Sequence, residues 1–438
     1  MMTMAKNIRV FGFALLALGA LASCKGGNNT VLPGTRVAIR PALAVQNASA
    51  SISLGTPISN AGWLQAGYSA THVAPNLALA SAPVLRWSAD IGQGNSDRSR
   101  ITSSPVVAAA GVIYTMDAAG HVQANAAENG ARLWRVDITP IGEQNGAQGF
   151  GGGLALEGDR LYATSGFGAL LSLNAATGAE NWRYPFDAPL HGTPTVSAGR
   201  VYVVASNDIA YAVDGAKGKL SWQMAGPRGT GPVAMGGSAP AVSGQNVVLP
   251  YASGRVIGAT AGGTGRWSED VNQARLSDVR ATIGGMTGAP VIAGGRAIVG
   301  NAGGQISALR LTTGTPDWTV PVGATGRAAV IGGSVFVVSD SSQLLRINAG
   351  NGQVIWATQL PEFTKPEKRK GFVAHYGPVV AGGQVIVAGT DGRLRFFDPA
   401  SGSETYSVAL PAGAASAPIV AAGVLYVINQ KGKLLAFQ

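Results

Sequence analysis

One short motif recurs along this chain: a Gly followed four positions later by an aromatic residue. Its seven copies are Gly130/Trp134, Gly178/Trp182, Gly218/Trp222, Gly263/Trp267, Gly314/Trp318, Gly352/Trp356 and Gly402/Tyr406. The aromatic residues lie roughly 40 to 50 positions apart, which is the repeat length of propeller blades. A propeller is one closed domain whatever its number of blades, so the repeat predicts a single domain despite the length of 438 residues.

The repeat is incomplete at both ends. The last unit begins normally but reaches Gln438 before its aromatic residue, whereas residues 84–88 carry Trp87 without a unit of their own. Joining the two ends predicts that residues about 84–90 form the outermost strand of the blade made by residues about 416–438. The predicted fold is therefore all-β: an eight-bladed β-propeller of four-stranded antiparallel blades over residues 83–438, with the last blade closed by the N-terminal strand.

Within each unit, short runs of β-branched and aromatic residues alternate with turn residues, a pattern typical of strands. An Asp or Asn lies four residues before several of the motif glycines, as at Asn174, Asp214, Asn348 and Asp398, and its side chain is expected to set the turn before the fourth strand. The Trp after this turn is large, flat and repeated. It fits the seam between adjacent blades, and cofactor stacking is the alternative role.

The N-terminus has the features of a processing signal. Lys6 and Arg9 precede an apolar stretch, residues 11–21, which is too short to span a bilayer. The stretch ends at Leu21-Ala22-Ser23-Cys24, which resembles a bacterial lipobox, and Cys24 is the single Cys of the chain. Residues 1–23 are thus predicted to be a lipoprotein signal peptide and Cys24 the lipidated residue. Position 25 is Lys rather than Asp, and similarity to sorted lipoproteins then implies the outer membrane.

Residues 24–82 contain many small and polar residues and little charge. We interpret this segment as the lipidated Cys and a tether, flexible in its first part. Trp63 and Tyr68 are two aromatic residues in an otherwise bland stretch, and we expect them to dock on the propeller.

The formal net charge is +10, and it falls to +8 when the signal peptide with Lys6 and Arg9 is removed. This surplus is compatible with an acidic partner or anionic headgroups. The basic residues are scattered and no recognition motif accompanies them, so nucleic acid is not expected as a partner. The run Lys365–Lys370 is either a solvated loop or a contact for an acidic surface or lipid headgroups.

No catalytic or metal site is expected from the sequence. The four His residues show no metal-ligand spacing, and no nucleophile elbow is visible. The Gly-rich stretch at residues 151–153 precedes a predicted strand rather than a helix, so we interpret it as a turn and not as a phosphate cradle.

The pattern Asp/Asn-x-x-x-Gly-x-x-x-Trp resembles the repeat of quinoprotein-like eight-bladed propellers, and the resemblance covers roughly residues 84–438. That superfamily contains quinone-dependent dehydrogenases and the BamB lipoproteins of the outer-membrane β-barrel assembly machinery. Many of the enzymes place adjacent cysteines against the cofactor and need a calcium cage of carboxylates. This chain has one Cys, and its acids are sparse and not clustered.

The segment Arg275-Leu276-Ser277-Asp278-Val279 is similar to the loop by which BamB proteins hold the POTRA region of the barrel-inserting, BamA-like protein. A second such loop precedes Ser238-Ala239-Pro240. At two positions this chain departs from the family pattern: Met235 stands where an Arg is expected, and Arg280 where an acid is expected. The resemblance therefore implies partner-binding residues in two loops, 223–237 and 268–287, which are predicted to lie on one face: Met235, Arg275, Leu276, Ser277, Asp278 and Arg280.

These features favour a non-enzymatic scaffold without a cofactor, anchored by lipid to the periplasmic face of the outer membrane. Its expected partners are the BamA-like protein, through the POTRA region, and other Bam complex subunits. Two alternatives remain: a PQQ-dependent dehydrogenase or a degenerate relative of one, and a propeller that binds another envelope protein.

Overall fold

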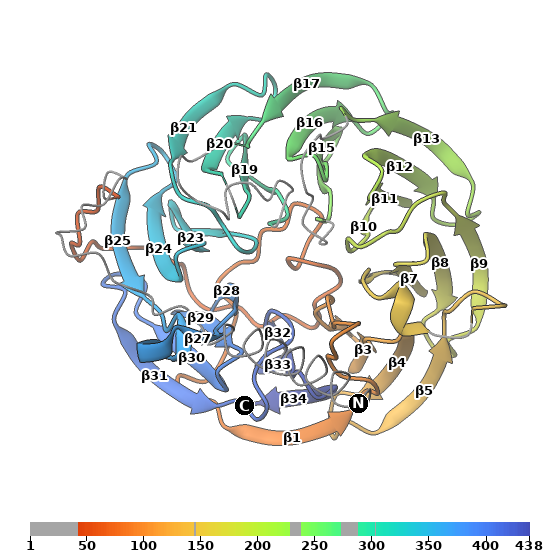
Figure 1. The fold of residues 1–438 in the computed structure, drawn as a ribbon, viewed down its shortest axis with the longest axis horizontal. Coiled ribbons are helices and arrows are strands. Elements are labelled where there is room, and N and C mark those ends of the chain that lie inside the picture. Colours follow the sequence, from red (N-terminus) through yellow and green to blue (C-terminus); the bar gives the residue numbers. More distant parts are fainter. Residues whose placement is uncertain (1–42, 144–145, 228–237, 273–287, 303) are drawn as a thin grey trace, which may run out of the picture. The chain divides into compact units, whose positions relative to one another are not determined.

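The computed structural model describes residues 43–143, 146–227, 238–272, 288–302 and 304–438. Eight four-stranded antiparallel sheets follow one another around a ring (Figure 1), which confirms the predicted eight-bladed propeller. In seven of the eight blades a short inner strand is followed outward to a longer outer strand, whereas in the seventh blade along the chain the inner strand β28 (His375–Ala381) has 7 residues and the outer strand β31 (Glu404–Ala409) has 6. In the part of the chain that is described, no helix is long and apolar enough to cross a membrane.

Seven blades are continuous in sequence. The first four are β2–β5 (Val106–Ala108, Val112–Met116, His121–Ala126, Arg132–Asp137), β6–β9 (Leu154–Glu157, Arg160–Ser165, Ala169–Asn174, Glu180–Pro185), β10–β13 (Thr195–Ser197, Arg200–Ala205, Ile209–Asp214, Leu220–Ala225) and β14–β17 (Ala241–Ser243, Asn246–Pro250, Arg255–Thr260, Gly265–Asp270). The next three are β18–β21 (Val291–Ala293, Arg296–Gly300, Ile306–Arg310, Pro316–Val320), β22–β25 (Ala329–Ile331, Ser334–Val338, Gln343–Asn348, Val354–Gln359) and β28–β31 (His375–Ala381, Gln384–Gly389, Arg393–Phe397, Glu404–Ala409).

The eighth blade combines the two ends of the repeat array. Its strands lie in the order β1-β34-β33-β32, where β1 is Leu85–Asp90 and the others are Lys433–Phe437, Val424–Ile428 and Ile419–Ala421. β1 pairs antiparallel with β34, and the Trp87 ring lies 6.0 Å from that of Tyr426. The predicted closure by residues 84–90 is confirmed.

The Gly-x-x-x-Trp repeat locks each blade to the next. A Cβ on each motif glycine would come within 2.5–2.9 Å of the indole of the preceding unit, so only Gly lets the two surfaces meet. Six of these indoles also donate a hydrogen bond of 2.8–3.1 Å to a turn carbonyl of the following blade. The repeated Trp thus lies at the blade seam, as predicted, where a polar bond accompanies the apolar burial.

Residues 58–77, here called the inner segment, cross the middle of the ring (Figure 1). Residues of this segment hydrogen bond to seven of the eight blades, mostly at their inner strands: Asn60 to the eighth blade, Trp63, Leu64 and Gln65 to the first three, Ala70 and Thr71 to the next two, and Leu77 to the seventh. An inner strand leaves backbone N–H and C=O groups unpaired toward the channel, and the inner segment satisfies part of them.

The docking expected of Trp63 is visible in its burial and contacts. Trp63 is 1% exposed, exchanges two backbone hydrogen bonds with Val107 and packs edge-on against Tyr68 at 5.5 Å. Upstream, Val45 pairs with Val354 in the sixth blade, and Ala50 donates to the Ala400 carbonyl in the seventh. Residues 43–82 therefore pack along the propeller.

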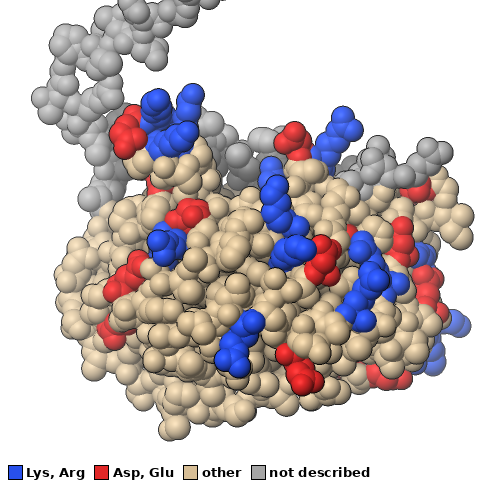
Figure 2. Space-filling view, turned by 90° about the horizontal axis from the view of Figure 1, so that it is seen from below, with Lys and Arg blue, Asp and Glu red and all other residues tan. Residues whose placement is uncertain are grey.

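Charged residues of both signs are mixed over the side of the propeller that Figure 2 shows. The positive surplus is therefore not gathered into one large patch on that side.

Candidate functional site

The predicted partner-binding residues lie outside the described residues, as does Cys24: Met235, Arg275, Leu276, Ser277, Asp278 and Arg280. The structure describes the strands at the bases of both loops. The first loop joins β13 to β14 and the second joins β17 to β18, so each connects an outer strand to the inner strand of the next blade. In a propeller such connections emerge on one face, and these two belong to neighbouring blades.

A chain of hydrogen bonds joins the bases of the two loops across three blades. The Asp208 carboxylate accepts the Ser253 N–H at 3.0 Å, and the Ser253 carbonyl accepts from the Asn272 amide at 2.6 Å. The Asn272 side-chain oxygen in turn accepts from Asn301 at 2.6 Å. Asp208 and Asn301 are buried, so these hydrogen bonds fix the position of Asn272, where the second loop begins, relative to both adjacent blades.

The base of the first loop packs against an aromatic side chain. Tyr251 is fully buried, and its hydroxyl donates a hydrogen bond of 3.1 Å to the Met224 carbonyl, next to the end of β13. Burial raises the pKa of the Tyr251 hydroxyl, so it stays a neutral donor. A Cβ at Gly226 would come within 2.5 Å of the Tyr251 ring, so the chain leaves the blade in contact with this residue.

The basic run Lys365–Lys370 lies in another connection on the same face. It folds into a hairpin of β26 (Phe363–Lys365) and β27 (Lys370–Phe372), joined by a 3₁₀ turn over Pro366–Lys368. The Arg369 guanidinium lies 5.6 Å from the centre of the Phe363 ring, and Phe372 is 52% exposed. The sequence indicated only a long connection here, because a two-stranded hairpin of charged residues lacks an apolar alternation.

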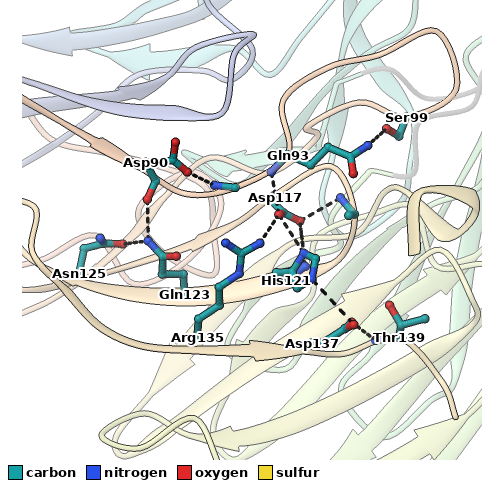
Figure 3. A network of polar contacts seen from close by, with 12 residues as sticks. Asp90, Gln93, Ser99, Asp117, His121, Gln123, Asn125, Arg135, Asp137 and Thr139 are labelled. Carbon is teal, nitrogen blue, oxygen red and sulfur yellow. Dashed lines mark hydrogen bonds and ion pairs between the residues drawn. The ribbon is translucent and has the colours of Figure 1, made fainter. Parts of the chain in front are cut away.

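A polar network holds the connection from β1 to β2, residues 91–105 (Figure 3). Asp117 is at its centre, and its carboxylate accepts hydrogen bonds from the Gln93 N–H at 2.9 Å and from Arg135 at 3.0 Å. It also accepts from the His121 backbone N–H and lies 2.9 Å from the His121 Nδ1. Gln93 then reaches the Ser99 hydroxyl at 3.2 Å.

The network sets the charge of its members. Burial alone would raise the pKa of Asp117, but the hydrogen bonds from His121 and Gln93 outweigh it and hold that pKa below its usual value. The hydrogen bond to Asp117 raises the pKa of His121. Asp117 is therefore a buried anion with four hydrogen-bonded neighbours, Gln93, Ala119, His121 and Arg135. Asp117 could not be identified from the sequence, because a single Asp in a turn forms no recognisable motif.

A central cavity of about 440 Å³ opens where the inner strands begin. Arg100, Arg327, His191, His375 and several Ser and Thr hydroxyls line it, and Ala66 of the inner segment contributes to the lining as well. No Asp or Glu is among the described residues of this lining. Elsewhere in the described ranges, no three His, Cys, Asp or Glu side chains are grouped so that they could hold a metal ion.

The chain is similar in sequence to known proteins over most of its length. A sequence profile described as outer membrane protein assembly factor BamB matches residues 118–358 and 363–438. A curated BamB from Yersinia pestis is 24% identical over 374 residues, which cover 81% of this chain and 89% of that protein.

Among solved structures, BamB from Moraxella catarrhalis superposes with a TM-score of 0.67 at 18% identity, covering 82% of this chain and 100% of the other. The quinohemoprotein alcohol dehydrogenase from Comamonas testosteroni gives a TM-score of 0.65 at 14% identity, covering 86% of this chain and 80% of the other. At these identities the two structures show the common propeller fold and do not separate the scaffold from the enzyme.

Proposed function

This chain belongs to the outer membrane protein assembly factor BamB family, and from that premise we propose that it is a non-enzymatic scaffold in the assembly of outer-membrane β-barrel proteins. In this proposal it docks the POTRA region of a BamA-like protein and works beside other Bam complex subunits. Rigidity is the mechanism, since the closed ring presents the connecting loops as one fixed surface.

The observation that carries the docking proposal is the shared base of the two loops. Asp208, Ser253, Asn272 and Asn301 tie neighbouring blades together directly beneath loops 223–237 and 268–287. Two loops that start from one rigid base are expected to form one continuous patch. In that patch Arg275 and Asp278 would provide directional polar contacts, and Leu276 and Met235 would provide apolar area; Ser277 and Arg280 belong to the same proposed surface.

A capture experiment with the purified POTRA region tests this proposal. Leu276→Ala and Asp278→Ala are each expected to weaken capture, because residues near the centre of an interface dominate its binding energy. Removing one partner of a buried charge pair costs about 2–5 kcal/mol. A thermal melt of each variant checks that the ring stays folded. Undiminished capture by the doubly substituted protein would reject this surface as the docking site.

The basic hairpin supplies a comparison in the same experiment. Replacing Lys365, Lys368, Arg369 and Lys370 by Gln should reduce capture less than the Leu276/Asp278 pair does. Any reduction should also shrink as salt is added, because exposed charges are screened beyond about 10 Å at 0.1 M salt. A larger and salt-independent loss from the hairpin variant would move the docking surface to the hairpin.

Anchoring by lipid at Cys24 is the second part of the proposal. Multiple acyl chains hold a protein on a membrane far more firmly than one chain does. Cys24→Ser should therefore release the protein from outer membranes while the propeller stays folded. If this variant still sedimented with outer membranes in cells that lack the protein partner, the lipobox interpretation would be wrong.

A quinone-dependent dehydrogenase remains the second candidate because of the shared fold. Calcium prefers six to eight oxygen ligands, with carboxylates prominent among them. The described lining of the central cavity has two Arg residues and no carboxylate, which does not fit a calcium cage. Recovery of a quinone together with calcium from the purified protein would favour the enzyme over the scaffold.

A further inference from the structure

The central cavity has a floor. Ala66 lines it, and the neighbouring Gly67 lies against Arg327, since a Cβ at position 67 would come within 2.9 Å of the Arg327 Nε. Gly67 has a φ of +75°, a conformation that Gly adopts readily and other residues rarely do. The inner segment thus passes beneath the cavity and leaves room for one guanidinium group on its floor.

Arg327 is a cation without an anionic partner in the described structure. It forms no hydrogen bond or ion pair with any described residue, although it is partly buried and lines the cavity. Burial lowers its pKa to about 10, so it remains charged near neutral pH. A guanidinium group that has lost part of its hydration is stabilised most by a carboxylate or a phosphate, because the oxygens of these anions match its planar set of donors.

The groups around Arg327 leave its charge uncompensated. His72 lies next to Arg327 and is 2% exposed. Its burial, and to a lesser extent the positive charge of Arg327, lowers the pKa of His72 to about 3. Burial also lowers the pKa values of His191 and His375, which line the same cavity. All three imidazoles are therefore neutral at pH 7, and the charge that the described residues present to the cavity is positive.

Arg100 adds a second cation from another part of the ring. It is exposed and lies between two buried residues, Ser99 and Ile101, in the connection that the Asp117 network holds (Figure 3). The Ile101 N–H donates to the Asn95 side chain at 2.8 Å, and the Asn95 N–H donates to the Gln430 carbonyl at 2.8 Å. These bonds fix the backbone next to Arg100, which is part of the cavity lining.

We propose that the central cavity binds a small anion carrying carboxylate or phosphate groups, held by Arg327 on the floor and by Arg100 from the side. The volume of about 440 Å³ is in the range of small-molecule sites. The wall hydroxyls of Thr102, Ser103, Ser104, Thr325 and Ser416 already donate to backbone carbonyls, whereas the Thr193 hydroxyl can donate to an oxygen of such a ligand. Ser238, Ala239 and Ala289, which follow the two proposed docking loops, also line the cavity, but neither Arg327 nor Arg100 belongs to those loops.

Calorimetric titration of the full-length protein with citrate and with inorganic phosphate at low salt tests the proposal. At least one of these probes should bind, and the neutral polyol sorbitol should not. Arg327→Gln and Arg100→Gln should each weaken binding by about tenfold or more, the usual effect of losing a charge-assisted hydrogen bond. The matched control is Arg132→Gln, which makes the same change on an exposed position of β5 and should bind like the wild type.

Each outcome decides the question. Binding that weakens in the two cavity variants and not in Arg132→Gln supports the site, and the stronger of the two probes identifies a carboxylate or a phosphate ligand. If Arg327→Gln does not fold, Arg100→Gln still tests the proposal, because Arg100 is exposed and makes no hydrogen bond to the described residues. The proposal would be overturned if neither citrate nor phosphate bound, or if all variants bound the probes equally well.

Discussion

The Lys433 ammonium donates a hydrogen bond of 2.7 Å to the Asp90 carboxylate, although 343 positions separate the two residues. The bond crosses from β34 to β1, so it lies on the strand pair that closes the ring. The hydrogen bond from Lys433 lowers the pKa of Asp90. Both side chains are well exposed, and the backbone pairing beneath them contributes most of the closure.

Deleting residues 84–90 should therefore damage the protein far more than breaking the ion pair. The deletion exposes the edge of β34, a template for pairing with other chains, and aggregation is expected. Lys433→Gln should change the free energy of unfolding by less than about 1 kcal/mol and leave the protein dispersed. Light scattering and urea unfolding of the two variants check this, and a dispersed, fully stable deletion variant would contradict the closure.

Two glycines of the third blade separate seam packing from backbone strain. Gly218 (φ +65°) lies against the Trp182 indole, whereas Gly199 (φ +72°) has no atom within 4 Å of its missing Cβ. Gly199→Ala should lower the free energy of unfolding by about 1–2 kcal/mol, because its left-handed backbone conformation is unfavourable for Ala. Gly218→Ala should cost about 1–3 kcal/mol more, because its Cβ overlaps the indole. Urea unfolding gives both values; equal costs would mean that the seam adapts.

Neighbouring residues of the inner segment test its role in stability. Trp63 is 1% exposed, whereas Leu64 is 42% exposed, and the backbones of both bond to inner strands. Trp63→Ala should lower the free energy of unfolding by about 3–5 kcal/mol, as for other buried aromatic residues. Leu64→Ala should change it by about 0.5 kcal/mol or less. Similar small losses from both would show that the inner segment is dispensable for the fold.

His72 should make stability depend on pH. Its folded-state pKa of about 3 lies below the unfolded value of 6.5, so the unfolded chain takes up the proton first as the pH falls. Stability is then lost progressively between pH 6.5 and pH 3, and the effect vanishes above pH 6.5. From pH 7.5 to pH 5.0 the wild type should lose about 2 kcal/mol more than His72→Asn does.

Asn suits this substitution because His72 has a φ of +63°, which Asn tolerates better than most residues. His191 and His375 are unchanged in the variant, so their contributions cancel in the comparison. Urea unfolding at the two pH values gives the difference, and parallel losses in both proteins would show that His72 is protonated in the fold.

The ring could be predicted from the sequence because its determinants are local and repeated. Each Gly-x-x-x-Trp copy specifies one turn and one seam contact, and the unpaired Trp87 identifies the closing strand. The contacts of the inner segment could not be predicted, because Leu64 and Ala70 bind through backbone atoms to strands far away in sequence. No side-chain pattern marks such contacts.

The candidate site was less predictable than the fold. The docking loops rest on similarity to a family, and the chain Asp208–Ser253–Asn272–Asn301 beneath them involves ordinary turn residues from three blades. Arg100 and Arg327 are two of 32 basic residues, and only the closed ring brings them to one cavity. The partners of such residues depend on tertiary structure rather than on spacing in the chain.

Site-specific photocrosslinking in cells tests the docking surface most directly. A photoreactive residue at position 276 should give an adduct with the BamA-like protein. The same photoreactive residue at position 217 should give no adduct. Lys217 is exposed in the turn between the third and fourth strands of its blade, and such turns lie on the opposite face. Adducts from position 217 without any from position 276 would contradict the proposed docking face.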